Sequence, residues 1–113
     1  MKASHEPGRM LVVDDNRVNR LLLTHALEQN GHIVSTAEHG RIAMNMLHSK
    51  TFDVILLDID MPEMNGFEVL EALLQDDQLR DLPVIMTSAS DELDRVVKCI
   101  EMGAEDYLVK PLN

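Results

Sequence analysis

Three carboxylates, a hydroxyl and a lysine each stand where a short apolar run of the chain ends. Asp14 and Asp15 come directly after the first run, and Asp58 follows the run with the strongest strand character. Ser88 and Lys110 follow two later runs of the same kind. Carboxylates that lie close together repel one another, so a cluster of three needs raised pKa values or a positive counter-charge. A divalent cation would supply such a charge.

The residue types around these acids predict the kind of cation and the chemistry. Neither Cys nor His follows the apolar runs, and an oxygen-only ligand set favours Mg²⁺, with Mn²⁺ as the alternative, over zinc. Mg²⁺ prefers one or two carboxylates together with a phosphoryl oxygen. Asp58 is the candidate nucleophile, because a carboxylate can attack phosphorus and form an acyl phosphate. Lys110 would neutralise the developing charge, and the Ser88 hydroxyl would donate to a phosphoryl oxygen.

Strand-like apolar runs and helical repeats alternate along the chain. The expected strands are residues 10–13, 32–36, 52–57, 83–86 and 107–109, and the expected helices are 17–29, 40–49, 67–74 and a segment between a cap at Asp91 and Gly103. This alternation predicts a doubly wound α/β fold with a five-stranded parallel sheet. Ligands of such folds bind at the carboxyl ends of the strands, so the polar residues are expected to meet at one edge.

Each of these residues also has a simpler interpretation when it is taken alone. Asp14 and Asp15 would be a solvated helix cap, Ser88 a turn hydroxyl and Lys110 a surface charge. Tyr107 would be a packing residue. Their joint occurrence after successive apolar strands favours a common site.

Four motifs, in order, resemble those of a two-component response-regulator receiver domain. They are Val13-Asp14-Asp15-Asn16, Leu56-Leu57-Asp58-Ile59-Asp60-Met61-Pro62-Glu63-Met64-Asn65-Gly66, Thr87-Ser88-Ala89 and Tyr107-Leu108-Val109-Lys110-Pro111. The gaps between the motifs agree as well, and the resemblance runs from about Met10 to Pro111. It implies the flavodoxin-like strand order 2-1-3-4-5.

The resemblance also implies a role for each matching residue. Asp58 would accept a phosphoryl group from a sensor histidine kinase or a phosphotransfer protein. The metal ligands would be the side chains of Asp14, Asp15 and Asp58 and the backbone carbonyl of Asp60. Lys110, Ser88 and Ala89 would contact the phosphoryl group, and Ser88 and Tyr107 would form the conformational switch. Such a domain is a phosphoacceptor, not an enzyme, with at most self-catalysed phosphotransfer and dephosphorylation.

Two features depart from the family's pattern. The acidic side chain of Asp60 would face the mouth of the site, where we expect it to alter dephosphorylation and metal affinity. The chain also stops at Asn113, before the family's fifth helix. We therefore expect residues 10–113 to form a receiver domain that lacks its last helix, preceded by a flexible extension at 1–9, and to self-associate through the face left uncovered.

Composition limits the partners and the location. The 113 residues carry a net charge of −10, with a pI near 4.7, so direct binding to nucleic acid is not expected. One cysteine and no membrane-length apolar stretch predict a cytoplasmic protein without membrane insertion. The segment 91–106 is similar to receivers attached to nucleotide-cyclase outputs, which makes such an output domain a possible partner.

Two other functions compete with the switch. The spacing of Asp58 and Asp60 is similar to the Asp-x-Asp motif of haloacid-dehalogenase-like phosphatases, in which the first acid is the nucleophile and the second the general acid or base. That family places its metal-binding acids after the lysine, where only three residues follow here. The third alternative is an interaction module that keeps the fold without being phosphorylated.

Overall fold

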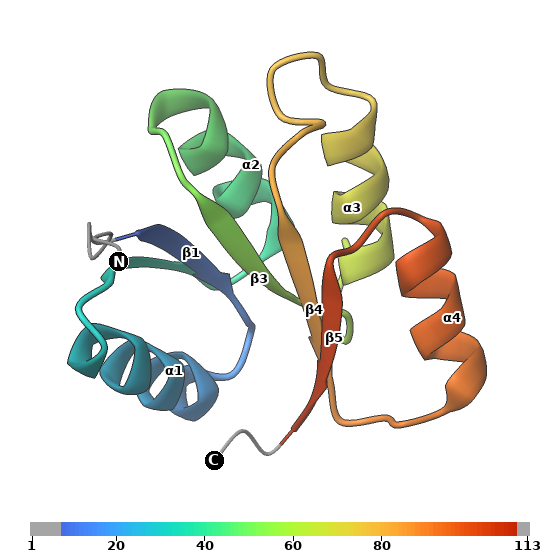
Figure 1. The fold of residues 1–113 in the computed structure, drawn as a ribbon, viewed down its shortest axis with the longest axis horizontal. Coiled ribbons are helices and arrows are strands. Elements are labelled where there is room, and N and C mark those ends of the chain that lie inside the picture. Colours follow the sequence, from blue (N-terminus) through green and yellow to red (C-terminus); the bar gives the residue numbers. More distant parts are fainter. Residues whose placement is uncertain (1–7, 111–113) are drawn as a thin grey trace, which may run out of the picture.

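Strands and helices alternate throughout the computed structural model, which describes residues 8–110 (Figure 1). The strands are β1 (Arg9–Val13), β2 (Ile33–Ala37), β3 (Val54–Asp58), β4 (Val84–Ser88) and β5 (Asp106–Val109). The helices are α1 (Arg17–Gln29), α2 (Gly40–Ser49), α3 (Gly66–Leu74) and α4 (Leu93–Glu101). All strand pairs are parallel and the order is β2-β1-β3-β4-β5, which confirms the predicted fold and order.

Successive residues of the central strands point to opposite faces of the sheet, and each face has its own apolar cluster. On one face, strand residues such as Leu11 and Leu57 pack with residues of α2, α3 and α4. On the other face, Met10, Val12 and Leu56 pack with residues of α1. Figure 1 shows the same division, with α1 on one side of the sheet and the other three helices across from it. Because both faces are apolar, the central strands read as continuous hydrophobic runs in the sequence.

The face that carries α1 has less helical cover. Within residues 8–110 only α1 packs there, and no residue of this helix is fully buried. Val18, Leu21 and Leu22 of α1 are 57–60% exposed, and Ile85 of β4 is half-buried. Self-association through this face stays a prediction.

Residues 1–7, most of the predicted flexible extension, lie outside the described residues, whereas Arg9 already belongs to β1.

Two strands run further toward their carboxyl ends than the apolar runs suggest. Asp58 is the last residue of β3, paired with Thr87, and Ser88 is the last residue of β4. Backbone hydrogen bonds continue past these positions, from the Ile59 N–H to the Thr87 carbonyl at 2.9 Å and from the Lys110 N–H to the Ser88 carbonyl at 2.8 Å. The two polar side chains therefore stand on rigid sheet, not on loops.

The predicted cap of α4 at Asp91 is wrong. The helix begins after Glu92, which makes no side-chain capping hydrogen bond, and Asp91 is exposed. The preceding loop is held by serine hydroxyls instead: Ser88 Oγ accepts from the Ser90 N–H at 3.1 Å, and Ser90 Oγ accepts from the Glu92 N–H at 3.2 Å. These bonds displace the helix start by one residue.

Gly66, the first residue of α3, lies against the backbone that carries Asp58. A Cβ at this position would come within 2.5 Å of the Asp58 carbonyl oxygen and 2.7 Å of Ile59 Cα. Because backbone atoms cannot move aside as a flexible side chain can, we expect Gly66→Ala to lower the free energy of unfolding by about 1–3 kcal/mol. Urea unfolding would measure it, with Gly40→Ala, whose Cβ meets only side chains, as the milder comparison. A Gly66→Ala protein as stable as the wild type would contradict this packing.

Candidate functional site

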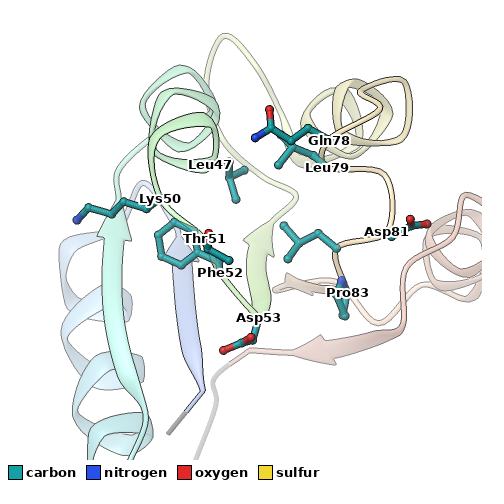
Figure 2. A pocket seen from close by; sticks show the side chains of 10 residues that line it. Leu47, Lys50, Thr51, Phe52, Asp53, Gln78, Leu79, Asp81 and Pro83 are labelled. Atoms are coloured by element: carbon teal, nitrogen blue, oxygen red, sulfur yellow. The ribbon is translucent and has the colours of Figure 1, made fainter.

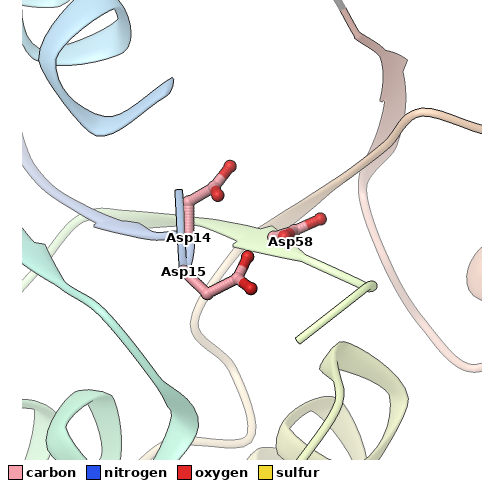
Figure 3. A group of neighbouring side chains, drawn as sticks. All are labelled: Asp14, Asp15 and Asp58. Atoms are coloured by element: carbon pink, nitrogen blue, oxygen red, sulfur yellow. The ribbon is translucent and has the colours of Figure 1, made fainter. Parts of the chain in front are cut away.

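The carboxyl edge of the sheet brings together the acids that the sequence places after β1 and at the end of β3. Asp14 and Asp58 are only 1% exposed, whereas Asp15 is exposed. Each of the three residues offers a carboxylate oxygen, and these atoms all lie within 4.8 Å of one another. Figure 3 shows Asp14 and Asp15 side by side on the segment that ends β1, with Asp58 on the neighbouring strand. The structure thus forms the acidic cluster that the motifs predict.

Lys110, which directly follows β5, supplies the positive charge of this cluster. Its Nζ lies 2.8 Å from Asp14 Oδ2 and 3.0 Å from Asp58 Oδ1, and its side chain is 15% exposed. Strand pairing fixes the position of the residue, because its backbone N–H bonds to the carbonyl of Ser88 at the end of the adjacent strand. One ammonium group therefore bridges the two most buried carboxylates of the described residues.

The environment raises the pKa values of both Asp58 and Lys110. Burial raises the pKa of Asp58 above its ordinary value of 3.8, and the nearby charge of Asp14 adds to this, although hydrogen bonding to Lys110 opposes it. Burial by itself would lower the pKa of Lys110, but its hydrogen bonds to Asp14 and Asp58 outweigh that effect and raise it above 10.5. The lysine is therefore charged at neutral pH, and the Asp58 carboxylate ionises less readily than a solvated one.

The raised pKa of Asp58 predicts a pH-dependent effect on stability. Because the folded protein binds this proton more tightly than the unfolded chain, the contribution of Asp58 to stability falls as pH rises from the unfolded pKa through the folded one. We expect Asp58→Asn to raise the melting temperature at pH 7 in EDTA and to raise it less near pH 4. Thermal unfolding across this pH range measures the difference. A variant less stable than the wild type at pH 7 would contradict a net cost of ionised Asp58.

The acidic cluster suits a hard divalent cation. Asp14 Oδ1 accepts a hydrogen bond from the Asn16 N–H at 2.8 Å, and the buried Oδ2 has the Lys110 ammonium, also at 2.8 Å, as its partner. One ammonium group does not balance the charge of three neighbouring carboxylates, and a divalent cation would supply the missing positive charge. The donor set consists of carboxylate oxygens alone, which matches Mg²⁺ or Mn²⁺.

Ser88 and Tyr107 lie beside the acidic cluster, at the same edge of the sheet. Ser88 is fully buried, and its Oγ donates to Asp60 Oδ2 at 2.8 Å, so it does not point its proton at Asp58 in this structure. The half-buried Tyr107 donates its hydroxyl proton to the Ser90 carbonyl in the loop before α4. Ala89, between the two serines, is exposed. All the residues singled out in the sequence therefore lie at or beside one edge of the sheet.

One residue of this region, Arg95 on α4, escaped the sequence reasoning. Its Nη2 donates to Asp60 Oδ1 at 2.7 Å. Burial alone would raise the pKa of Asp60, but hydrogen bonds from Arg95 and Ser88 outweigh it and hold that pKa below 3.8. The two residues are far apart in the chain, and no local pattern marks a basic residue in a helix as the partner of a particular acid. Only the packing of α4 shows it.

A cavity lies at the opposite end of the molecule. It has a volume of about 330 Å³ and opens between the end of α2 and the segment that leads from α3 into β4 (Figure 2). Its lining residues are Leu47, Lys50, Thr51, Phe52, Asp53, Gln78, Leu79, Asp81, Leu82 and Pro83. None of the clustered acids contributes to it, so the chemistry-bearing groups and this cavity are separate.

The fold and the acidic edge define a phosphoacceptor type of α/β domain, and comparison with known proteins gives its family. Residues 10–113 match the response regulator receiver domain, and the chain belongs to this family. It is a receiver domain and not a classical enzyme. This family assignment decides against the haloacid-dehalogenase-like phosphatase. In such an enzyme Asp60 would be the general acid or base, but here both of its carboxylate oxygens accept hydrogen bonds, from Ser88 and Arg95.

Relatives from distant organisms support the assignment. The chain is 34% identical over 105 residues to the two-component response regulator ORR3 of Oryza sativa subsp. indica, covering 92% of this chain and 80% of that protein. It is 39% identical over 105 residues to the response regulator MprA of Mycolicibacterium vanbaalenii, covering 93% of this chain and 45% of that protein.

No helix in the described part of the chain is both long enough and apolar enough to cross a membrane.

Solved structures agree with the fold. The chemotaxis response regulator CheY4 of Vibrio cholerae superimposes with a TM-score of 0.89 at 33% identity, covering 96% of this chain and 90% of that one. The Mn²⁺-bound form of response regulator Rcp1 superimposes with a TM-score of 0.83 at 28% identity, covering 95% and 84%. Both similarities extend over nearly the whole chain.

Proposed function

We propose that this chain is a phosphorylation switch in which Asp58 accepts a phosphoryl group and the resulting change is passed to an output domain or partner. The observation that carries the proposal is the position of Asp58: its carboxylate is almost fully buried at the carboxyl edge, 3.0 Å from the Lys110 ammonium and beside the acids of β1. Burying a carboxylate costs free energy even when a lysine pairs with it, so a buried acid at this edge favours a chemical role.

The reaction asks little covalent chemistry of the protein. A carboxylate oxygen of Asp58 attacks phosphorus and forms a P–O bond, while the P–N bond to the histidine of a kinase or phosphotransfer protein breaks. The electron pair of the broken bond stays on the leaving nitrogen, and the ring departs as neutral imidazole because its other nitrogen carries a proton. Lys110 is placed to neutralise charge on the phosphoryl oxygens, since its ammonium already lies against Asp58. Positioning and charge compensation thus account for most of the protein's contribution.

The metal supporting this reaction would be Mg²⁺, with Mn²⁺ as the alternative. The residues that would hold it are Asp14, Asp15 and Asp58 with the backbone carbonyl of Asp60, and the three carboxylates gathered around a single lysine support this choice. When bound, such an ion neutralises charge on the phosphoryl oxygens. The Mn²⁺-bound form of Rcp1, a structural relative, supports a divalent ion in a domain of this type.

The switch itself would consist of Ser88 and Tyr107. A phosphoryl group on Asp58 offers the Ser88 hydroxyl a new, strongly charged acceptor, and Tyr107 is linked through the Ser90 carbonyl to the same loop. Ala89 is exposed, and its small side chain would leave room for a phosphoryl group to enter the site. A few charge-assisted hydrogen bonds would then shift an equilibrium between two arrangements of this loop.

The partners follow from the same proposal. A histidine kinase or phosphotransfer protein would donate the phosphoryl group, and an output such as a nucleotide cyclase would receive the signal. The exposed apolar side chains of α1 support self-association on that side of the sheet. The domain would comprise residues 10–113.

Intact mass spectrometry after incubation with Mg²⁺ and acetyl phosphate tests the proposal. We expect one phosphoryl adduct on the wild type, none on Asp58→Asn and none on either protein in EDTA. Asp91→Asn is the matched control, because Asp91 is an exposed acid near the same edge, and it should carry the adduct. A folded wild type without an adduct, or an equal adduct on Asp58→Asn, would contradict the proposal and favour the unphosphorylated interaction module.

A further inference from the structure

The carboxylate of Asp60 is engaged at both oxygens by side chains from two other elements. Ser88 Oγ, at the end of β4, donates to Oδ2 at 2.8 Å. Arg95 Nη2, on α4, donates to Oδ1 at 2.7 Å. Asp60 lies two residues beyond Asp58, which is the last residue of β3. One acid therefore joins the phosphoacceptor strand, the neighbouring strand and α4.

The hydroxyl of Ser88 has a single proton to donate. In this structure that proton is directed at Asp60, while the Ser88 oxygen accepts from the Ser90 N–H at 3.1 Å. Ser88 is fully buried, so no water competes for it. A hydrogen bond from Ser88 to a phosphoryl group on Asp58 would require the bond to Asp60 to break. The two acceptors are alternatives.

Arg95 keeps Asp60 oriented for this contact. Its guanidinium also lies over the Phe67 ring, 6.0 Å from the centroid, and this contact favours the side-chain orientation that reaches Asp60. Charge compensation by Arg95 also allows Asp60 to remain ionised close to Asp58. The ion pair links the first turn of α4, which has no side-chain cap, to the residue two positions after Asp58.

We propose that Asp60 is a positioning residue that competes with the phosphoryl group for the Ser88 hydroxyl, with Arg95 holding the carboxylate in place. The inference rests on the proposed phosphorylation of Asp58. The Ser88–Asp60 hydrogen bond must break before Ser88 can bind a phosphoryl group. The free energy of that bond therefore makes the binding free energy of a phosphoryl group less favourable.

Beryllofluoride, a non-covalent phosphoryl mimic, tests the competition. Its dissociation constant would be measured by titration calorimetry at saturating Mg²⁺ for the wild type, Asp60→Ala, Ser88→Ala and the double variant. We expect Asp60→Ala to tighten binding about tenfold when Ser88 is present, the effect of one charge-assisted hydrogen bond, and less than about threefold when it is absent. The Ser88→Thr background, which keeps the hydroxyl, should restore the larger gain.

A variant with one fewer charge separates this competition from general repulsion. Glu63→Gln removes an exposed acid from the same loop without touching Ser88 or Arg95, and its effect should stay below about twofold. Equal gains from Asp60→Ala with and without Ser88 would overturn the inference, since Asp60 would then act by charge alone. A gain from Asp60→Ala no larger than that of Glu63→Gln would overturn it too. A wild type that binds no beryllofluoride, or an Asp58→Asn variant that binds it equally, would instead refute the proposed function on which the inference rests.

Discussion

Replacement of Lys110 by methionine is expected to lower the free energy of unfolding of the metal-free protein by about 3–5 kcal/mol, the usual cost of removing one partner from a buried ion pair. Methionine keeps the apolar length of the side chain but leaves Asp14 and Asp58, each 1% exposed, without their shared counter-charge. Two buried carboxylates within 4.8 Å of each other would then repel one another. That loss is a large fraction of the stability of a typical domain, about 5–15 kcal/mol.

Urea unfolding in EDTA and in Mg²⁺ measures this effect. Mg²⁺ should restore much of the lost stability, because a cation in the cluster replaces the missing charge. The double variant Lys110→Met/Asp58→Asn should also recover stability, since it removes one of the two unpaired acids. Lys50→Met, at an exposed lysine away from the cluster, is the matched control and should change stability by less than about 0.5 kcal/mol. A Lys110→Met protein no less stable than this control would show that the lysine does not compensate the buried acids.

The second large effect is expected for Asp14→Asn, which should slow Mg²⁺-dependent phosphoryl uptake from acetyl phosphate by about 100-fold or more. Asparagine keeps an oxygen for the Asn16 N–H but removes the charge of one of the two buried carboxylates of the cluster. The Lys110 ammonium retains Asp58 as its partner, so the fold should survive. The loss should therefore lie in metal affinity and in the rate, not in folding.

The dependence of the uptake rate on Mg²⁺ concentration, followed by intact mass, distinguishes these contributions. The wild type should saturate at a lower Mg²⁺ concentration than Asp14→Asn, and excess Mg²⁺ should recover part of the variant's rate. Asp91→Asn serves as the control for loss of one acidic charge near the same edge. If Asp14→Asn takes up the phosphoryl group with the Mg²⁺ dependence of the wild type, Asp14 is not a metal ligand.

The competition inferred for Asp60 bears on both expectations. Lys110 and the acids of the cluster determine whether a phosphoryl group can be accommodated at all, whereas the Ser88–Asp60 bond would determine how favourable the occupied state is. A change at Asp60 should therefore alter affinity by a moderate factor, and a change at Lys110 or Asp14 should impair the site itself. The two classes of variant are distinguishable by whether excess Mg²⁺ rescues them.

Much of the architecture was determined by the sequence alone. Strands buried on both faces are continuous apolar runs, and helices between them repeat with the 3.6-residue period, so element types and order follow from local patterns. Parallel connections then force the carboxyl ends of β1, β3, β4 and β5 to one edge. For this reason the sequence alone assigns four residues to a common site, namely Asp14, Asp58, Ser88 and Lys110. The family resemblance depends on the same residues.

Other features were decided only by the tertiary structure. Asp91 has the right type and position for a cap of α4, yet the hydroxyls of Ser88 and Ser90 organise the preceding loop and the helix begins later. The pairing of Arg95 with Asp60, across 35 residues, depends on how α4 packs against the sheet. Hydrogen bonds between distant side chains require particular rotamers and distances, which no local pattern encodes. The sequence therefore determined which groups share the edge, and the packing decided which acid accepts the hydrogen bond from the Ser88 hydroxyl.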